Sequence, residues 1–125
     1  MGMKRFKTAE YINKDYPKSD KYSRTEVLTA EDGAVDLGGI FGILQPGGHV
    51  PYHIHIARES VFIALYGEAI QIVEGKDHPI KAGDIMFIPS GEKHGLVNKS
   101  NTPFRYLEFW THPPALADFV ETSLS

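Results

Sequence analysis

Short apolar segments alternate with turn-forming residues along almost the whole chain. The segments are rich in Ile, Val, Phe and Tyr, and Gly, Pro, Asn, Asp or Ser stands at their ends, a pattern typical of β-strands joined by tight turns. A helix is expected only near the C-terminus, from Pro114 to about Val120, because the fixed φ of proline suits a first helical turn. The predicted strands cover residues 24–28, 39–45, 51–56, 60–66, 69–73, 78–81, 85–88, 95–98 and 104–110.

Strands of this length, with no helices between them, can bury one face only against a second sheet or by closing on themselves. We therefore predict an all-β jelly-roll barrel with a short C-terminal helix. Alternation along one strand places Val61, Ile63 and Leu65 on a single face, which we expect to be the interior one. We assign residues 25–125 to one barrel domain and residues 1–24 to an N-terminal arm.

Composition fits one domain and narrows the chemistry. The chain has 125 residues, 42% of them hydrophobic, which is enough for one core. It has no cysteine, so disulfides, thiolate metal ligands and thiol nucleophiles are excluded. No apolar run approaches the roughly 20 residues that span a bilayer, and no leader-like segment is recognisable. We expect a cytoplasmic protein that has no membrane partner.

Charge is distributed unevenly along the chain. The net charge is −3, yet basic side chains predominate in residues 1–24 and acidic ones in the remainder. The basic residues of the arm are interspersed with acids and aromatics and form no nucleic-acid-binding motif. We therefore expect no nucleic-acid partner, and an arm that packs on the acidic barrel of its own or of a partner subunit.

Two histidines stand one residue apart on a predicted strand. His53 and His55 then project from one face, while Tyr52 and Ile54 project from the other. Such a pair either supplies two nitrogen ligands to a metal ion or consists of histidines that merely have hydrogen-bond partners. A carboxylate, Glu59, follows four residues after His55, and this context favours the metal site.

A second segment spaces glycine, proline, histidine and asparagine at intervals that each have a mechanical reason. Gly83 turns the chain into a strand, and Pro89 ends that strand where the next amide need not pair. Gly91 permits a positive φ, after which His94 opens a returning strand. Asn98 at the end of the segment reads as a turn residue rather than as a ligand.

The stretches Gly47–Gly67 and Gly83–Asn98 together resemble the paired motifs of the cupin superfamily, and the resemblance extends from about Gly39 to Trp110. It implies a double-stranded β-helix of the small single-domain kind. It also implies that one divalent metal ion lies in the barrel mouth, bound by the residues at the matching positions, which are His53, His55, Glu59 and His94.

One position of the first motif is ambiguous. Glu59 fits the shorter of the two spacings that the pattern allows after the histidine pair, but Gly67 then lies one residue later than the pattern requires. With the longer spacing Ser60 takes the carboxylate position, and serine is a poor ligand. We predict Glu59, because a carboxylate suits a dication better and a bulge absorbs the extra residue.

Three imidazoles and one carboxylate would leave two positions of an octahedral ion open to substrate or water. Fe, Mn, Ni, Co, Cu and Zn all remain candidates, because this ligand type does not select sharply among them. Three further residues are weaker pocket candidates. Tyr106 could line the pocket, Arg58 could hold an anionic substrate, and His49 could reach the pocket rim.

Two classes of function follow from the resemblance. The first is a small-molecule enzyme of the dioxygenase, decarboxylase, isomerase or lyase type, with an oxidoreductase such as a dioxygenase as the leading example. The alternative is a protein that binds a sugar or an organic acid without turning it over. Small cupins commonly pair through their sheets, so we expect a homodimer in which Tyr11, Tyr16 and Tyr22 help to cover a neighbour.

Overall fold

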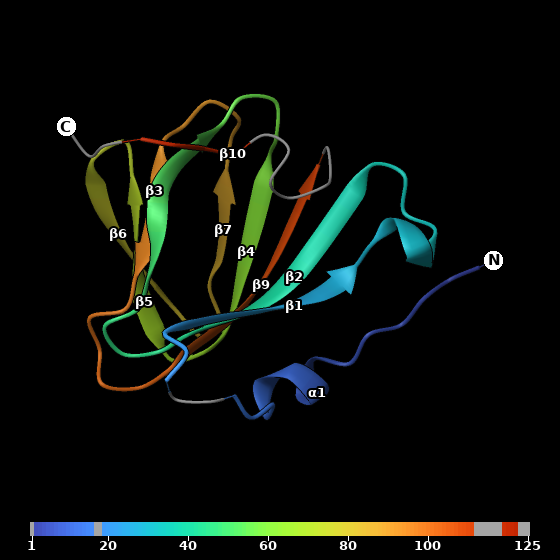
Figure 1. Ribbon diagram of the computed structural model, residues 1–125, viewed down its shortest axis with the longest axis horizontal. Helices are drawn as coiled ribbons and strands as arrows, with labels where there is room; N and C mark the ends of the chain where they lie inside the picture. Colours follow the sequence, from blue (N-terminus) through green and yellow to red (C-terminus); the bar gives the residue numbers. More distant parts are fainter. Residues whose placement is uncertain (1, 17–18, 112–118, 123–125) are drawn as a thin grey trace.

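The computed structural model of the chain describes residues 2–16, 19–111 and 119–122. Two five-stranded sheets face each other, and all of their strand pairs are antiparallel (Figure 1). One sheet has the strand order β1-β2-β9-β4-β7, and the other has the order β10-β3-β8-β5-β6. The predicted all-β jelly-roll barrel is confirmed.

Each predicted strand is present, and its ends differ from the prediction by about two residues at most. The first sheet contains β1 (Tyr22–Leu28), β2 (Leu37–Leu44), β4 (Ser60–Tyr66), β7 (Ile85–Ile88) and β9 (Phe104–Thr111). The second contains β3 (His49–His55), β5 (Glu68–Val73), β6 (Lys76–Lys81), β8 (His94–Val97) and β10 (Phe119–Glu121). Two short helical segments lie outside the sheets, α1 (Thr8–Ile12) and the 3-10 turn η1 (Ala30–Asp32).

The expected C-terminal helix is wrong where the structure tests it. Phe119–Glu121 form β10, which pairs with residues 53–55 of β3. Residues 114–118, the first part of the expected helix, lie outside the described residues. Without β10, one edge of β3 would leave its backbone N–H and C=O groups unpaired, and pairing with residues 119–121 satisfies them. This pairing is a long-range contact, so the local sequence signal for a helix could not reveal it.

The predicted inward face of β4 is also the wrong one. Phe62 and Ala64 are 4% and 3% exposed and belong to the core between the sheets, whereas Val61, Ile63 and Leu65 lie half-buried on the outer face. That outer face is covered by a second apolar cluster, which contains Val27, Phe41, Ile43 and Leu107 with Tyr11, Tyr16 and Phe109 packed against them. Because both faces of β4 are apolar, hydrophobicity alone could not choose between them.

Glycines on β2 make room for aromatic rings on β9. Gly42 pairs with Tyr106, and Gly38 pairs with Trp110. A Cβ atom on Gly42 would lie 2.5 Å from Cζ of Tyr106, and one on Gly38 would lie 2.7 Å from Nε1 of Trp110. Only glycine lets these rings lie against the neighbouring strand. Both rings are buried and line the barrel interior.

The N-terminal segment packs on its own sheet. Tyr11 of α1 and Phe41 of β2 have their ring centroids 5.3 Å apart, and the hydroxyls of Tyr16 and Thr25 share a hydrogen bond. Figure 1 shows α1 outside the barrel, below β1 and β2. Strand β1 begins at Tyr22, so the sheet starts two residues before the end of the arm as assigned from the sequence.

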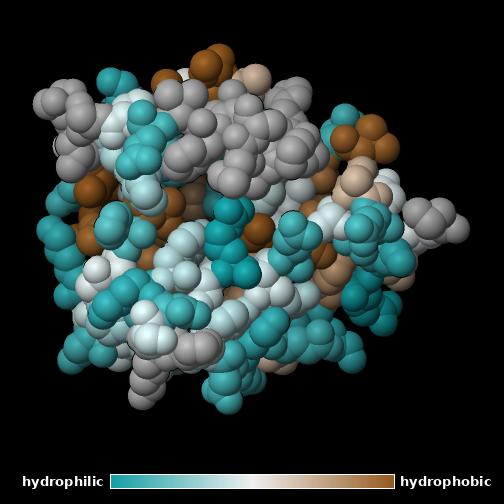
Figure 2. Space-filling model, viewed as in Figure 1, coloured by the Kyte–Doolittle hydropathy of each residue, from teal (hydrophilic) through white to brown (hydrophobic). Residues whose placement is uncertain are grey.

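The surface seen in Figure 2 is largely hydrophilic, with hydrophobic side chains in small separate groups, some at its margin and others between the hydrophilic ones. Isolated apolar residues on a surface are normal for a folded domain. Within the described ranges, no helix has the length and apolar composition needed to cross a membrane. A cytoplasmic location stays a prediction.

Asn98 ties three backbone segments together. Its buried side chain donates from Nδ2 to the carbonyl oxygens of Leu44 and Thr102, both at 2.8 Å, and its Oδ1 accepts a hydrogen bond from the backbone amide of Ser100 at 2.9 Å. The expectation that Asn98 acts as a turn residue is confirmed.

Replacing this side chain should destabilise the fold. Asn98→Ala removes these hydrogen bonds from a buried site and takes the side-chain donor away from the Leu44 carbonyl, so we expect the free energy of unfolding to fall by about 3 kcal/mol. Urea unfolding followed by tryptophan fluorescence would measure the change. The exposed neighbour provides the control, since Lys99→Ala should change the free energy by less than about 0.5 kcal/mol. Equal effects of the two variants would contradict the role given to Asn98.

Candidate metal centre

Three histidines from two adjacent strands converge inside the barrel. His53 on β3 is the direct partner of His94 on β8, and His55 lies two residues further along β3 on the same face. The ring of His53 has its centroid 4.8 Å from that of His55 and 4.2 Å from that of His94. All three side chains are buried, and one nitrogen from each lies within 4.8 Å of the others. The structure thus brings together three of the four predicted ligands.

Backbone carbonyls fix the orientation of two of these rings. Nδ1 of His53 donates to the oxygen of Pro51 at 2.6 Å, and Nδ1 of His94 donates to the oxygen of Glu92 at 3.0 Å. A carbonyl oxygen only accepts, so Nδ1 carries the proton and Nε2 keeps its lone pair. Nε2 of His94 is buried and has no hydrogen-bond partner in the described part of the chain. This is the tautomer and the orientation that metal-binding histidines adopt.

Burial keeps His53 and His94 neutral. The pKa of His53 is lowered to about 3, chiefly by burial and in addition by the neighbouring His94. Burial also lowers the pKa of His94. The hydrogen bond to the Glu92 carbonyl raises this pKa, but burial has the larger effect. A neutral imidazole is the form that binds a metal ion, so protons do not compete strongly with a cation at neutral pH.

Glu59 is not part of this cluster. Its side chain is exposed and lines a surface groove with Leu37 and Phe87, outside the barrel. Its backbone is held by Thr111, which donates its amide to the Glu59 carbonyl at 3.1 Å and accepts from the Glu59 amide through Oγ1 at 3.0 Å. The structure therefore does not bring the predicted carboxylate ligand to the histidines.

The reason lies in the alternation along β4. Ser60 is buried and shares the inward face with Phe62 and Ala64, so the preceding residue, Glu59, points outward. Of the two spacings of the first motif, the longer one, which counts from Ser60 to Gly67, matches this strand.

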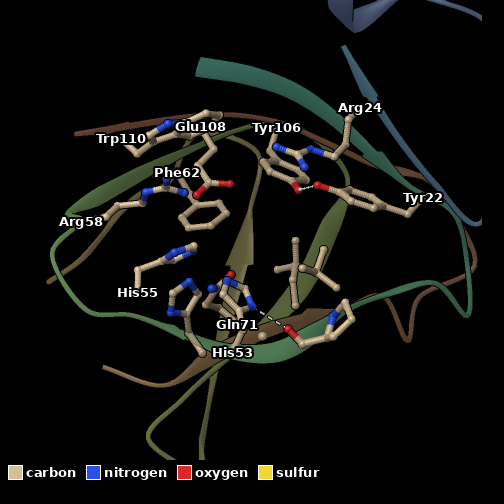
Figure 3. Close-up of a pocket in the computed structure, with 15 residues that line it drawn as sticks. Tyr22, Arg24, His53, His55, Arg58, Phe62, Gln71, Tyr106, Glu108 and Trp110 are labelled. Atoms are coloured by element: carbon tan, nitrogen blue, oxygen red, sulfur yellow. Dashed lines mark hydrogen bonds between the residues drawn. The ribbon is translucent and has the colours of Figure 1, made fainter. Parts of the chain in front are cut away.

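The histidines form one wall of a cavity of about 180 Å³ inside the barrel. Figure 3 shows His53 and His55 on one side and, facing them, a row of polar and aromatic side chains. The residues of that facing wall that Figure 3 labels are Tyr22, Arg24, Arg58, Phe62, Tyr106, Glu108 and Trp110.

Two of the three weaker pocket candidates line the cavity. Arg58 is 2% exposed, and its guanidinium carbon lies 5.3 Å from the ring centroid of Trp110, which is within cation–π range. The Tyr106 hydroxyl is 2.8 Å from that of Tyr22. Burial raises the pKa of Tyr22 to about 12 and that of Tyr106 well above its usual value, so both hydroxyls stay protonated. His49 is exposed at the start of β3 and is not among the residues that line this cavity.

Gln71 is a cavity residue that was not predicted from the sequence. This side chain on β5 is fully buried and lines the cavity, and neither Oε1 nor Nε2 has a hydrogen-bond partner among the described residues. Buried amides without partners are rare because each unsatisfied group costs about 1 to 3 kcal/mol. A single polar residue in the apolar run Ala69–Val73 was the available signal. The arrangement fits an amide that hydrogen-bonds to a ligand.

Glu108 was also missed. It lies on β9 between Tyr106 and Trp110, at alternating positions that face the cavity. The residue is half-buried, and Figure 3 shows its carboxyl group pointing into the cavity. Burial raises the pKa of Glu108 to about 7, although Arg24, a hydrogen bond from Ser60 and Arg58 all lower it. The carboxyl group is therefore poised to change protonation near neutral pH.

The fold and the site together define the class of protein, a double-stranded β-helix with a histidine cluster inside the barrel. Comparison with known protein families supports the same class. The family model described as Cupin domain matches residues 40–110. The chain belongs to the cupin family, as the motif resemblance implies.

Individual relatives match over parts of their length. The oxalate-binding protein of Thermotoga maritima is 42% identical over 64 residues, which cover 51% of this chain and 53% of that protein. The auxin-binding protein ABP19a of Prunus persica is 35% identical over 65 residues, which cover 48% of this chain and 31% of that protein. The chain thus spans about half the length, or less, of these curated relatives.

Solved structures extend the likeness to the whole fold. The predicted oxalate decarboxylase of Thermotoga maritima is 31% identical with a TM-score of 0.68, and the match covers 74% of this chain and 81% of that one. A double-stranded β-helix protein of Klebsiella pneumoniae is 24% identical with a TM-score of 0.78, and the match covers 98% and 99% of the two chains. The second likeness concerns the fold alone.

If the Gln71 amide serves a ligand, removing it should stabilise the protein. Gln71→Leu replaces two unsatisfied buried polar atoms by apolar ones of similar shape, so we expect the free energy of unfolding of the ligand-free protein to rise by about 1 to 3 kcal/mol. Urea unfolding of the metal-free protein would measure it. A loss of stability of similar size would contradict the interpretation, because it would mean that the amide is already satisfied.

Proposed function

We propose that the protein binds one divalent transition-metal ion through His53, His55 and His94 and uses it to bind and transform a small organic acid. The observation that carries this proposal is the convergence of three buried imidazoles, two of them oriented through Nδ1 by backbone carbonyls. Three protein ligands leave positions for ligand oxygens. The bound ion would supply Lewis-acid chemistry there. Fe, Mn, Ni, Co, Cu and Zn remain candidates for it.

The facing wall supports an acidic ligand. Arg58 and Arg24 bring positive charge to the cavity, and guanidinium groups bind carboxylates with well-directed hydrogen bonds. The hydroxyl pair Tyr22 and Tyr106 adds hydrogen-bonding groups of high pKa. The cavity of about 180 Å³ is smaller than the roughly 300 Å³ at which pockets for drug-sized ligands begin. The oxalate-binding relative supports the same ligand class.

Two functional classes are compatible with this site. A metal-dependent enzyme of the dioxygenase, decarboxylase, isomerase or lyase type is favoured by Glu108, because a carboxyl group of near-neutral pKa beside a metal site suits proton transfer. The alternative, binding of an organic acid or sugar without turnover, needs the histidines and Arg58 but has no use for a titrating carboxyl group.

Metal binding can be tested by substitution. Stripped protein dialysed against Mn²⁺ or Co²⁺ and examined by elemental analysis should hold about one ion per chain, and His53→Ala should weaken binding at least tenfold. His49→Ala is the matched control, since it removes an exposed histidine from the same strand. Glu59→Gln should also leave metal content unchanged. Full metal binding by His53→Ala would contradict the proposal. Loss of metal in Glu59→Gln would show that Glu59 is a ligand, as the sequence predicts.

The two classes are separated by turnover. Oxalate, a diketone and a catechol would each be added to the metal-loaded protein, while oxygen consumption, carbon dioxide release and ligand binding are followed. Turnover that disappears in His53→Ala but persists in His49→Ala is the result expected for an enzyme. Saturable binding of oxalate with no change in any of the three compounds would favour the binding protein.

We also propose that the protein forms a homodimer through the outer face of the first sheet. Ile85 and Phe87 on the edge strand β7 are 71% and 58% exposed, and Leu37 on β2 is exposed as well. Phe87 and Leu37 line the same surface groove. Apolar side chains gathered on a sheet with a free edge are typical of a protein interface.

Sedimentation velocity would test the dimer. We expect a species of twice the chain mass, and Phe87→Glu should raise its dissociation constant at least tenfold by placing a charge in an apolar contact. Val35→Glu, at an exposed apolar residue that does not line this groove, should leave the dimer intact. A monomeric wild-type protein would refute the proposal. Deleting residues 1–20 tests the arm separately, because a dimer that survives unchanged would rule out its contribution.

A further inference from the structure

The cavity contains one carboxyl group among its described lining residues, that of Glu108. Its strand, β9, belongs to the first sheet, whereas β3 and β8, which carry the histidines, belong to the second. Figure 3 accordingly shows Glu108 reaching into the cavity from the wall opposite His53 and His55. A ligand held at the histidines would therefore occupy the space between them and this carboxyl group.

We propose that Glu108 is the acid–base group of this cavity and exchanges one proton with an organic acid held at the histidine cluster. The inference relies on the proposed function only for the nature of the ligand. The position of the carboxyl group, its neighbours and its access to the cavity are properties of the chain itself.

Charged and titratable groups surround Glu108 from every neighbouring element. Arg24 comes from β1, Arg58 from the segment between β3 and β4, and the Ser60 hydroxyl from β4. The remaining groups that share the cavity with it are the hydroxyls of Tyr22 and Tyr106 and the imidazoles of His53, His55 and His94. The two guanidinium groups and the hydroxyl favour the carboxylate, whereas burial favours the neutral acid. Burial outweighs the three lowering influences and raises the pKa of Glu108 to about 7. Both forms are therefore populated near neutral pH, as an acid–base group requires.

The proton transfer balances without any further reactant. In the acid direction the O–H bond of Glu108 breaks, the proton passes to a ligand atom that carries a lone pair, and the electron pair of the bond stays on the carboxylate. Arg24 and Arg58 stabilise the negative charge that remains. In the base direction the carboxylate takes a proton from the ligand. Exchange with solvent restores the starting state in both cases.

Ligand binding should then be coupled to proton uptake. An anion that enters the cavity repels the Glu108 carboxylate and favours its neutral form. Oxalate is a suitable probe because both of its carboxyl groups are ionised at neutral pH, so it brings no proton of its own. Titration calorimetry of Mn²⁺-loaded protein with oxalate near pH 7, in two buffers of different ionisation enthalpy, should report uptake of up to about one proton per oxalate.

Two matched variants would show whether Glu108 is the group that takes up the proton. Glu108→Gln, which keeps the shape but cannot titrate, should retain metal and lose the proton uptake. Glu26→Gln, at an exposed glutamate on β1, should take up as many protons as the wild type. Equal uptake by Glu108→Gln and the wild type, or oxalate binding without uptake in the wild type, would overturn the proposal. If Glu108→Gln does not fold, Glu108→Asp keeps a carboxyl group and should show uptake displaced along the pH axis.

A second measurement needs neither metal nor ligand. Carbon-13 NMR of protein labelled at its glutamate carboxyl groups should show one resonance that titrates near pH 7 and is absent in Glu108→Gln. If oxalate does not bind, the proposed ligand is wrong, but this titration still decides the role of Glu108. A wild-type spectrum in which every glutamate titrates in the ordinary range for carboxyl groups would refute it.

Discussion

The structure depends on one constraint, the direct pairing of His53 with His94 across two antiparallel strands. Opposite residues of an antiparallel pair project to the same side, and residues two apart on one strand do so too. Once β3 and β8 are in this register, three imidazoles must meet at one place. Burial then keeps His53 and His94 neutral by lowering the pKa of each, and the Pro51 and Glu92 carbonyls set the orientation of these two rings.

The opposite wall follows from packing of another kind. On β2, Gly42 and Gly38 leave space for Tyr106 and Trp110 of β9 to lie against the sheet. Glu108 stands between these two rings along the strand and enters the same cavity. The cavity therefore has a wall that carries the three imidazoles and a wall that carries charged side chains. The histidines come from the second sheet, and Glu108 comes from the first. This division lets one site hold a cation on one side and contact the organic part of a ligand on the other.

The positions of the strands and the grouping of the three histidines could be predicted from the sequence, because both depend on the local spacing of residues. Turn residues mark the strand ends, and the intervals around His53, His55 and His94 specify strands of known direction. The inward face of β4 was not predictable, since Val61 and Phe62 are both apolar and the outer face is covered by a cluster from distant segments. Glu59 was assigned on ligand chemistry, whereas the alternation of β4 places Ser60 inward. Gln71 and Glu108 are polar residues between apolar neighbours on two strands that are distant in the sequence, and only the assembled barrel shows that they share a cavity.

Strand β10 lies along residues 53–55 of β3, the stretch that carries two of the three histidines (Figure 1). Hydrogen bonds from this last strand therefore hold the backbone from which two imidazoles project. Any free energy that an ion contributes by ordering those residues also favours the attached strand, and by thermodynamic reciprocity attachment of the strand strengthens the hold on the ion by the same amount. With an ion bound, β10 and the histidine cluster would therefore behave as one cooperative unit, although they are far apart in the sequence.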